Sequence, residues 1–256
     1  MKKFMIVAAL MFVAGGASAQ VSIPAEGAEP APGPAVVATD TAVRERVWPD
    51  FHAVEIQGVM SVRLKVADAE HPVGVNFYTS DPSTGKYTRE VENGVLKLKV
   101  QKAQSADSVR VTVYYTKLDR INADRAAVEV VGPLKAHLLD LKVSGGARFT
   151  ATLDVADVSL EVTGRSEVFL SGKTRYLDAV VSTALTSLRK LEAMSVDVEA
   201  SNKAEVSVCA TDRIKMKSTT GAVIRYGGNP AIERSTIPSL LSGTLERVDS
   251  TSNSRR

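Results

Sequence analysis

A short pattern, alternating apolar residues followed by small ones, recurs along the middle of this chain at a nearly fixed interval. Its small hydroxylated residue falls at Ser144, Thr163, Ser182 and Ser201, which are three consecutive steps of 19 residues. A further copy around Ser218 is about two residues shorter. A repeat of about 20 residues is typical of a solenoid, in which each repeat is one supersecondary unit stacked on the next.

The alternation inside each copy identifies the kind of solenoid. Apolar residues stand at every second position, as at Leu160 and Val162 before the small residues and at Val168 and Leu170 after them. That period is typical of a strand, whereas helical repeats need roughly 33 to 45 residues. Two short strands joined by a tight corner of small residues fit one coil of a parallel β-helix. A larger Cβ would clash at such a corner, and the coils would stack about 4.8 Å apart.

The segment from Trp48 to about Tyr115 has longer and less regular strands than the repeats, which run from Leu118 to Gly228. It includes Asn93-Gly94 between two alternating runs, the strongest short hairpin signal. A solenoid needs atypical ends, because an open end exposes an unpaired strand edge and the core. We therefore expect an all-β, single-domain, right-handed parallel β-helix with coils of about 19 residues and an irregular N-terminal β cap.

The chain ends suggest export. Residues 1–19 predict a signal peptide, with Lys2 and Lys3 before an apolar run and a small-residue cleavage site at Ala17-Ser18-Ala19. The apolar run is shorter than the ~20 residues that span a bilayer, so we expect no integral membrane segment after cleavage. Residues 20–47 predict a Pro/Ala-rich linker, 48–230 a β-helix head domain, and 231–256 a mostly disordered tail with a short capping element at 237–241.

Composition narrows the range of partners. Removal of the signal peptide leaves 30 basic and 29 acidic residues, a net charge of +1, and only 5% of the whole chain is aromatic. We therefore expect no nucleic-acid partner, since nothing would attract a polyanion by bulk charge.

No constellation of catalytic or metal-binding residues stands out in the sequence. His52, His71 and His137 lack a second His or Cys at the spacing of metal ligands, and the single Cys209 predicts a small, half-buried side chain. The sequence therefore predicts no catalytic residue, no cofactor and no metal site.

Charged columns across adjacent coils leave one alternative open. Stacking at 19-residue intervals predicts two columns, one of Lys142, Glu161, Val180 and Glu199 and one of Arg148, Glu167, Thr186 and Glu205. Carboxylates two coils apart are compatible with the 5–10 Å that glycoside hydrolysis needs, which would make a catalytic groove. The alternative that we favour is that opposite charges on neighbouring coils, such as Lys142–Glu161 and Arg148–Glu167, form exposed pairs that help to fix the register.

Several segments resemble one known family, the head GIN domain, described as a putative auto-transporter adhesin. They occur in the family's order: Phe51–Gly58, Glu92–Leu98, Val109–Leu118, the corners Ser144–Ala147 and Thr163–Ser166, and Val223–Pro230. The resemblance covers about residues 51–230 and implies an exported β-helical domain without implying a known activity. The family usually has Gly at certain corner positions, and here we align Asp124, Thr183, Asn202 and Thr219 with them.

From these observations we expect an exported, non-catalytic β-solenoid, periplasmic or at the cell surface, that acts as an adhesin-like or envelope interaction module. Its expected partner is a glycan or an envelope protein of unknown identity. Two alternatives stay open, a polysaccharide lyase or hydrolase on the same scaffold and a purely structural envelope protein.

Overall fold

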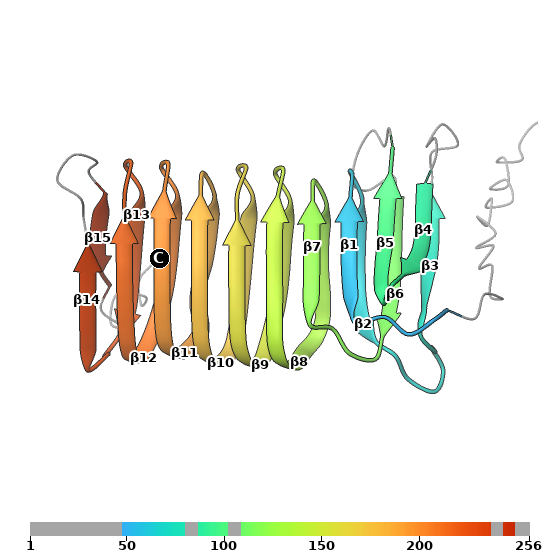
Figure 1. Ribbon diagram of the computed structural model, residues 1–256, viewed down its shortest axis with the longest axis horizontal. Coiled ribbons are helices and arrows are strands. Elements are labelled where there is room, and N and C mark those ends of the chain that lie inside the picture. The colour runs from blue at the N-terminus through green and yellow to red at the C-terminus, as the bar shows by residue number, and fades with distance from the viewer. Residues whose placement is uncertain (1–47, 80–86, 102–108, 237–242, 249–256) are drawn as a thin grey trace, which may run out of the picture. The chain divides into compact units, whose positions relative to one another are not determined.

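The computed structural model describes residues 48–79, 87–101, 109–236 and 243–248, all within one compact unit (Figure 1). The predicted signal peptide, the linker at residues 20–47 and the expected capping element at 237–241 lie outside these ranges. The described ranges consist of strands and turns, and they contain no helix long and apolar enough to cross a membrane. The fold is the expected all-β solenoid.

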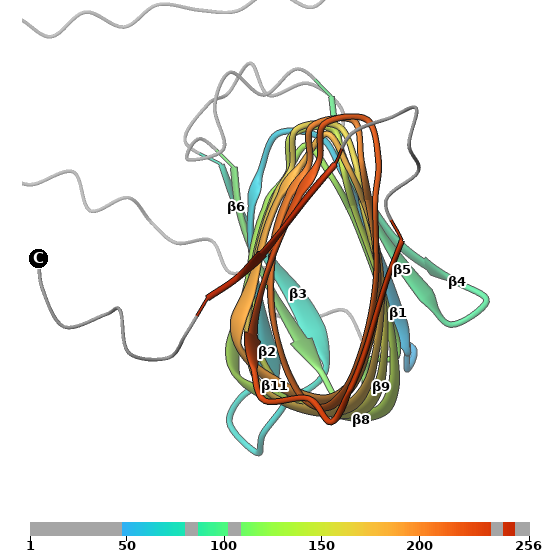
Figure 2. The ribbon, with the colours of Figure 1, turned by 90° about the vertical axis from the view of Figure 1, so that its left-hand side faces the viewer.

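Five long strands form the regular coils: β8 (Ala127–Ser144), β9 (Arg148–Val162), β10 (Glu167–Ser182), β11 (Leu185–Ser201) and β12 (Glu205–Ser218). Each strand bends once, so its first half lies on one face of the solenoid and its second half on the other (Figure 2). We expected two short strands per coil, but parallel pairing nearly continues through the bend. Between β9 and β10 only Arg175 drops out of the register there.

The predicted corner column is confirmed. The parallel register pairs Val143 with Val162, Val162 with Val181, and Ser182 with Ser201. The residues that follow the three valines are Ser144, Thr163 and Ser182, so these three and Ser201 stand in one line up one corner of the stack. This is the arrangement that the 19-residue interval predicts, because each strand hydrogen-bonds to its counterpart above and below.

Two copies of the corner are shifted by one residue from the expected alignment. Ala200 pairs with Ser218, so Thr219 and not Ser218 begins the next corner. Ser218 instead points inward, fully buried, and its Oγ donates a hydrogen bond to the carbonyl oxygen of Ala222 at 2.8 Å. Asp124 likewise pairs with Ser144, so it occupies the hydroxyl position and not the glycine position.

Small residues fill the inside of every corner. The residue that closes each turn points into the core and is almost fully buried, in this set of six: Ala126, Ala147, Ser166, Ala184, Ala204 and Ala222. Each lies under the equivalent residue of the next coil, so a larger side chain would collide with backbone that cannot move independently. This steric limit explains the small residues in the repeat. Along the strands, every second side chain is buried.

The N-terminal cap does not follow chain order. Strands β1 (Ala53–Gln57) and β2 (Ser61–Val66) form one coil, which is inserted between the coil of β5 (Val95–Val100) and β6 (Val109–Tyr115) and the coil of β7 (Arg120–Asp124) and β8. Two antiparallel strands then cover the outer edge, β3 (Gly74–Thr79) on β6 and β4 (Tyr87–Glu92) on β5. The β4–β5 hairpin turns at Asn93 and Gly94, both with positive φ, as the Asn-Gly pair predicts.

The stack also continues beyond residue 230, where we expected a mostly disordered tail. After β13 (Val223–Gly228), strand β14 (Ile232–Thr236) pairs in parallel with β12, and β15 (Thr244–Arg247) pairs with β13. These strands satisfy backbone groups at an edge that would otherwise be unpaired. Their sequence hid them, because β14 is exposed along its whole length and so has no alternation of apolar residues.

Candidate functional site

The first predicted column of charges is confirmed by the register and is made of ion pairs. Glu161 and Glu199 both pair with Val180, one on each side, and Val180 is 47% exposed. Lys142 Nζ lies 2.9 Å from the Glu161 carboxylate, and Lys217 Nζ lies 3.1 Å from that of Glu199. The hydrogen bond from Glu161 raises the pKa of the Lys142 ammonium. Both carboxylates are thus bonded to a cation on the neighbouring coil away from Val180.

The second column differs from the prediction at one position. Glu167 pairs with Arg148 on one side, but its partner on the other side is Leu185 and not Thr186. Thr186 is 1% exposed and points into the core, where its hydroxyl has no hydrogen-bond partner. The prediction assumed corners of equal length, and the turn before Leu185 is one residue shorter than its neighbours.

The carboxylates of this second column are also paired. Arg148 Nη1 lies 3.3 Å from the Glu167 carboxylate, and Arg225 Nη1 lies 3.0 Å from that of Glu205. Leu185, 42% exposed, stands between Glu167 and Glu205. The structure therefore brings each predicted carboxylate pair onto one face, two coils or about 10 Å apart by strand spacing. It also gives every member an ion-pair partner.

One carboxylate outside the two predicted columns has an altered acidity. Asp178 pairs with Asp197 on the adjacent coil, and Lys215 Nζ binds Asp197 at 2.7 Å. Burial raises the pKa of the Asp178 carboxyl, and the negative charges of Asp197 and Glu199 raise it further. Sequence reasoning missed this cluster, because it depends on which strands are neighbours.

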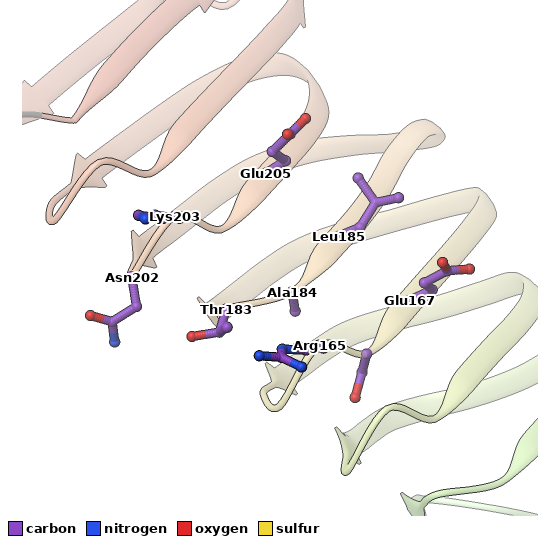
Figure 3. Close-up of a pocket in the computed structure, with 9 residues that line it drawn as sticks. Arg165, Glu167, Thr183, Ala184, Leu185, Asn202, Lys203 and Glu205 are labelled. Atoms are coloured by element: carbon purple, nitrogen blue, oxygen red, sulfur yellow. The ribbon is translucent and has the colours of Figure 1, made fainter.

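A groove opens at the corner where the turn is shortest. The turns Thr163–Ser166 and Ser201–Ala204 have four residues each, whereas the turn between them, Ser182–Ala184, has three. The short turn is set back between two longer ones, which leaves a groove of about 490 Å³. Figure 3 shows Glu167, Leu185 and Glu205 along one side of it.

The opposite side of the groove carries two cations on strained turns. Arg165 and Lys203 have φ of 62° and 61°, and Thr183 of the short turn has a φ of 54°. Among the residues that the structure describes, no carboxylate lies within ion-pair distance of the Arg165 guanidinium or the Lys203 ammonium. Asn202, beside Lys203, donates from Nδ2 to the Ser182 hydroxyl at 2.9 Å. The sequence signal for this groove is the one missing corner residue between Ser182 and Leu185.

The histidines and the cysteine lie apart from this groove. No group of three His, Cys, Asp or Glu side chains within the described ranges could hold a metal ion. His71 binds Asp68 in a local turn at 3.2 Å, and His137 lies 3.9 Å from Asp157 at the opposite bend. Cys209 is half-buried, and burial raises the pKa of its thiol, as does the negative charge of Glu192.

Solved structures with the same fold come from gut Bacteroidota. An adhesin structure from Bacteroides fragilis, titled "putative", superposes with a TM-score of 0.72 at 16% identity, covering 78% of this chain and 94% of that one. A second "putative adhesin", from Parabacteroides distasonis, gives 0.62 at 18% identity with 78% and 93% coverage. A "putative lipid binding protein" from Parabacteroides distasonis gives 0.60 at 15% identity with 80% and 95% coverage. At these identities the likeness shows the fold alone.

The sequence itself gives the family. No curated protein sequence matches this chain. The family described as "Putative auto-transporter adhesin, head GIN domain" matches residues 50–230, which include the corner repeats, the groove and most of the cap. The protein therefore belongs to the head GIN domain family.

Proposed function

We propose that this protein is an exported, non-catalytic β-solenoid that acts as an adhesin-like interaction module of the cell envelope. One observation carries the proposal: every carboxylate of the two columns is neutralised by a neighbouring cation, whereas two groove cations have no carboxylate partner among the described residues. A hydrolase of this kind needs one carboxyl group that gives up a proton and a second that attacks or activates water. Groups held in exposed ion pairs suit a structural role better.

The scaffold supports binding in a second way. Its coils hold outward side chains in rows at a fixed spacing, on strands whose backbone groups are already paired. A surface of this kind is preorganised, so little conformational entropy is lost when a ligand binds. The family description and the titles of two relatives point to adhesion, and residues 1–19 predict export.

The proposal is tested by incubating the purified protein with bacterial envelope fractions and with isolated envelope polysaccharides. We expect saturable binding without release of new reducing ends. Failure to bind any fraction at micromolar protein would refute the interaction module and favour a purely structural envelope protein.

The carboxylate spacing keeps the enzymatic alternative testable. A polysaccharide lyase or hydrolase would produce new chain ends, and that activity would disappear in Glu161→Gln or Glu167→Gln. Cleavage by the unchanged protein that both substitutions abolish would replace the proposal with the enzyme.

A further inference from the structure

We propose that the groove at the short corner binds an acidic polysaccharide, with Arg165 and Lys203 bonded to its carboxylate groups. This inference rests on the proposed interaction function and assigns a site and a ligand class to it. The two cations stand on the turns that flank Ser182–Ala184, so their backbones lie two coils or about 10 Å apart. The groove therefore presents positive charge at two separated points along the solenoid axis (Figure 3).

The charge balance of the groove favours an anion. Its two carboxylates, on Glu167 and Glu205, are already paired with Arg148 and Arg225, which do not line the groove. Ion pairs between the groove's own cations and described carboxylates are absent. An incoming carboxylate would thus meet cations that need not first give up a partner, and charge-assisted hydrogen bonds to such groups are stronger than neutral ones.

The hydrogen-bonding groups of the groove suit a sugar chain better than a peptide. Peptides that bind sheets in extended form need a row of unpaired backbone groups. Here the backbone is occupied: Arg165 N donates to Thr183 O at 2.7 Å, and the nitrogens of Leu185 and Glu205 donate to the preceding coil at 3.0 Å each. What remains is side-chain chemistry, the Thr183 hydroxyl and the Asn202 carbonyl, around the exposed Leu185. Hydroxyl and amide groups around a small apolar floor match the hydroxylated ring of a sugar.

The test measures binding of the purified protein to polygalacturonate and to its methyl ester, which keeps the hydroxyl groups but removes the negative charge. The variant is Arg165→Asn with Lys203→Asn, because Asn tolerates the positive φ of both positions. The matched control is Arg125→Asn. Arg125 also has a positive φ on a corner turn, but it pairs with Asp124 and does not line the groove.

We expect the unchanged protein to bind polygalacturonate, and to bind the methyl ester at least about tenfold more weakly. The double variant should lose about tenfold in affinity, whereas Arg125→Asn should stay within about twofold. Added salt should weaken binding of the unchanged protein, because the groups are exposed. Circular dichroism and urea midpoints equal to those of the unchanged protein would show that the variants are folded.

Two outcomes separate this inference from the proposed function. If the unchanged protein and the double variant bind envelope fractions equally, or polygalacturonate is not bound while those fractions are, the groove assignment is overturned and the interaction module stands. If neither protein binds polygalacturonate or any envelope fraction, both are overturned.

Discussion

Replacing Thr183 by Gly should make this protein more stable, although the change removes a side chain. Thr183 begins the short turn beside the groove and holds a φ of 54°, a region that β-branched residues rarely enter. Its hydroxyl makes no hydrogen bond to another described residue, so the folded state gains nothing visible in return for the strain.

The size of the gain follows from two opposing costs. An L-residue in the left-handed region costs roughly 1–2 kcal/mol, and glycine avoids this cost. Glycine in turn loses about 0.5–1 kcal/mol of additional backbone entropy on folding. We therefore expect Thr183→Gly to raise the free energy of unfolding by about 1 kcal/mol. In a domain of this size that corresponds to a rise in Tm of about 2–4 °C.

Urea unfolding followed by circular dichroism measures the change, with Asn202→Gly as the control. Asn202 has a φ of 53° on the next corner, but Asn tolerates this region and its amide binds Ser182, so we expect no gain there. Equal gains in both variants, or no gain in Thr183→Gly, would refute the reasoning about strain. Because strained residues cluster at functional sites, we also expect Thr183→Gly to bind polygalacturonate a few-fold more weakly while being more stable.

Three further predictions concern stability and are checked by urea unfolding. Thr186→Val should stabilise the protein by about 1 kcal/mol, because the buried Thr186 hydroxyl has no partner; a loss would mean that it has one. Gly172→Ala should cost about 3 kcal/mol, since its Cβ would lie 2.0 Å from a backbone oxygen of the adjacent coil, whereas Gly132→Ala meets open space and should cost only about 1 kcal/mol; equal losses would contradict this. Asp178→Asn should stabilise by a few tenths of a kcal/mol at pH 7. Burial and the charge of Asp197 raise the pKa of Asp178, so the folded state prefers the protonated form, and the advantage of Asn should vanish below pH ~4, where the aspartate is neutral as well. A benefit that persists at pH 3 would exclude this cause.

The sequence alone determined the coil and its corner. A period of 19 residues with strand alternation allows one stacking, because a one-residue slip would turn every buried side chain toward solvent. The column of Ser144, Thr163, Ser182 and Ser201 follows from that period, as do the ion pairs Lys142–Glu161 and Arg148–Glu167. Each of these features depends only on residues one coil apart.

The tertiary structure alone decided the order of the coils at the N-terminus. The coil of β1 and β2 lies between two coils that follow it in the chain. Backbone hydrogen bonds carry no label of which strand they join, so the order depends on how the whole cap closes over the core. The strands β14 and β15 were hidden for a related reason, since backbone pairing places them and not apolar alternation.

The groove also had to wait for the structure, because two irregularities cancel in the sequence. The turn at Ser182–Ala184 lacks one residue, and β11 takes that residue back in a bulge, where Ser187 to Lys190 faces Phe169 to Ser171. Ser182 and Ser201 therefore stay 19 residues apart, and the repeat looks unbroken. Spacing records only the total length of a coil, whereas the groove depends on how that length is divided between the turn and the strand.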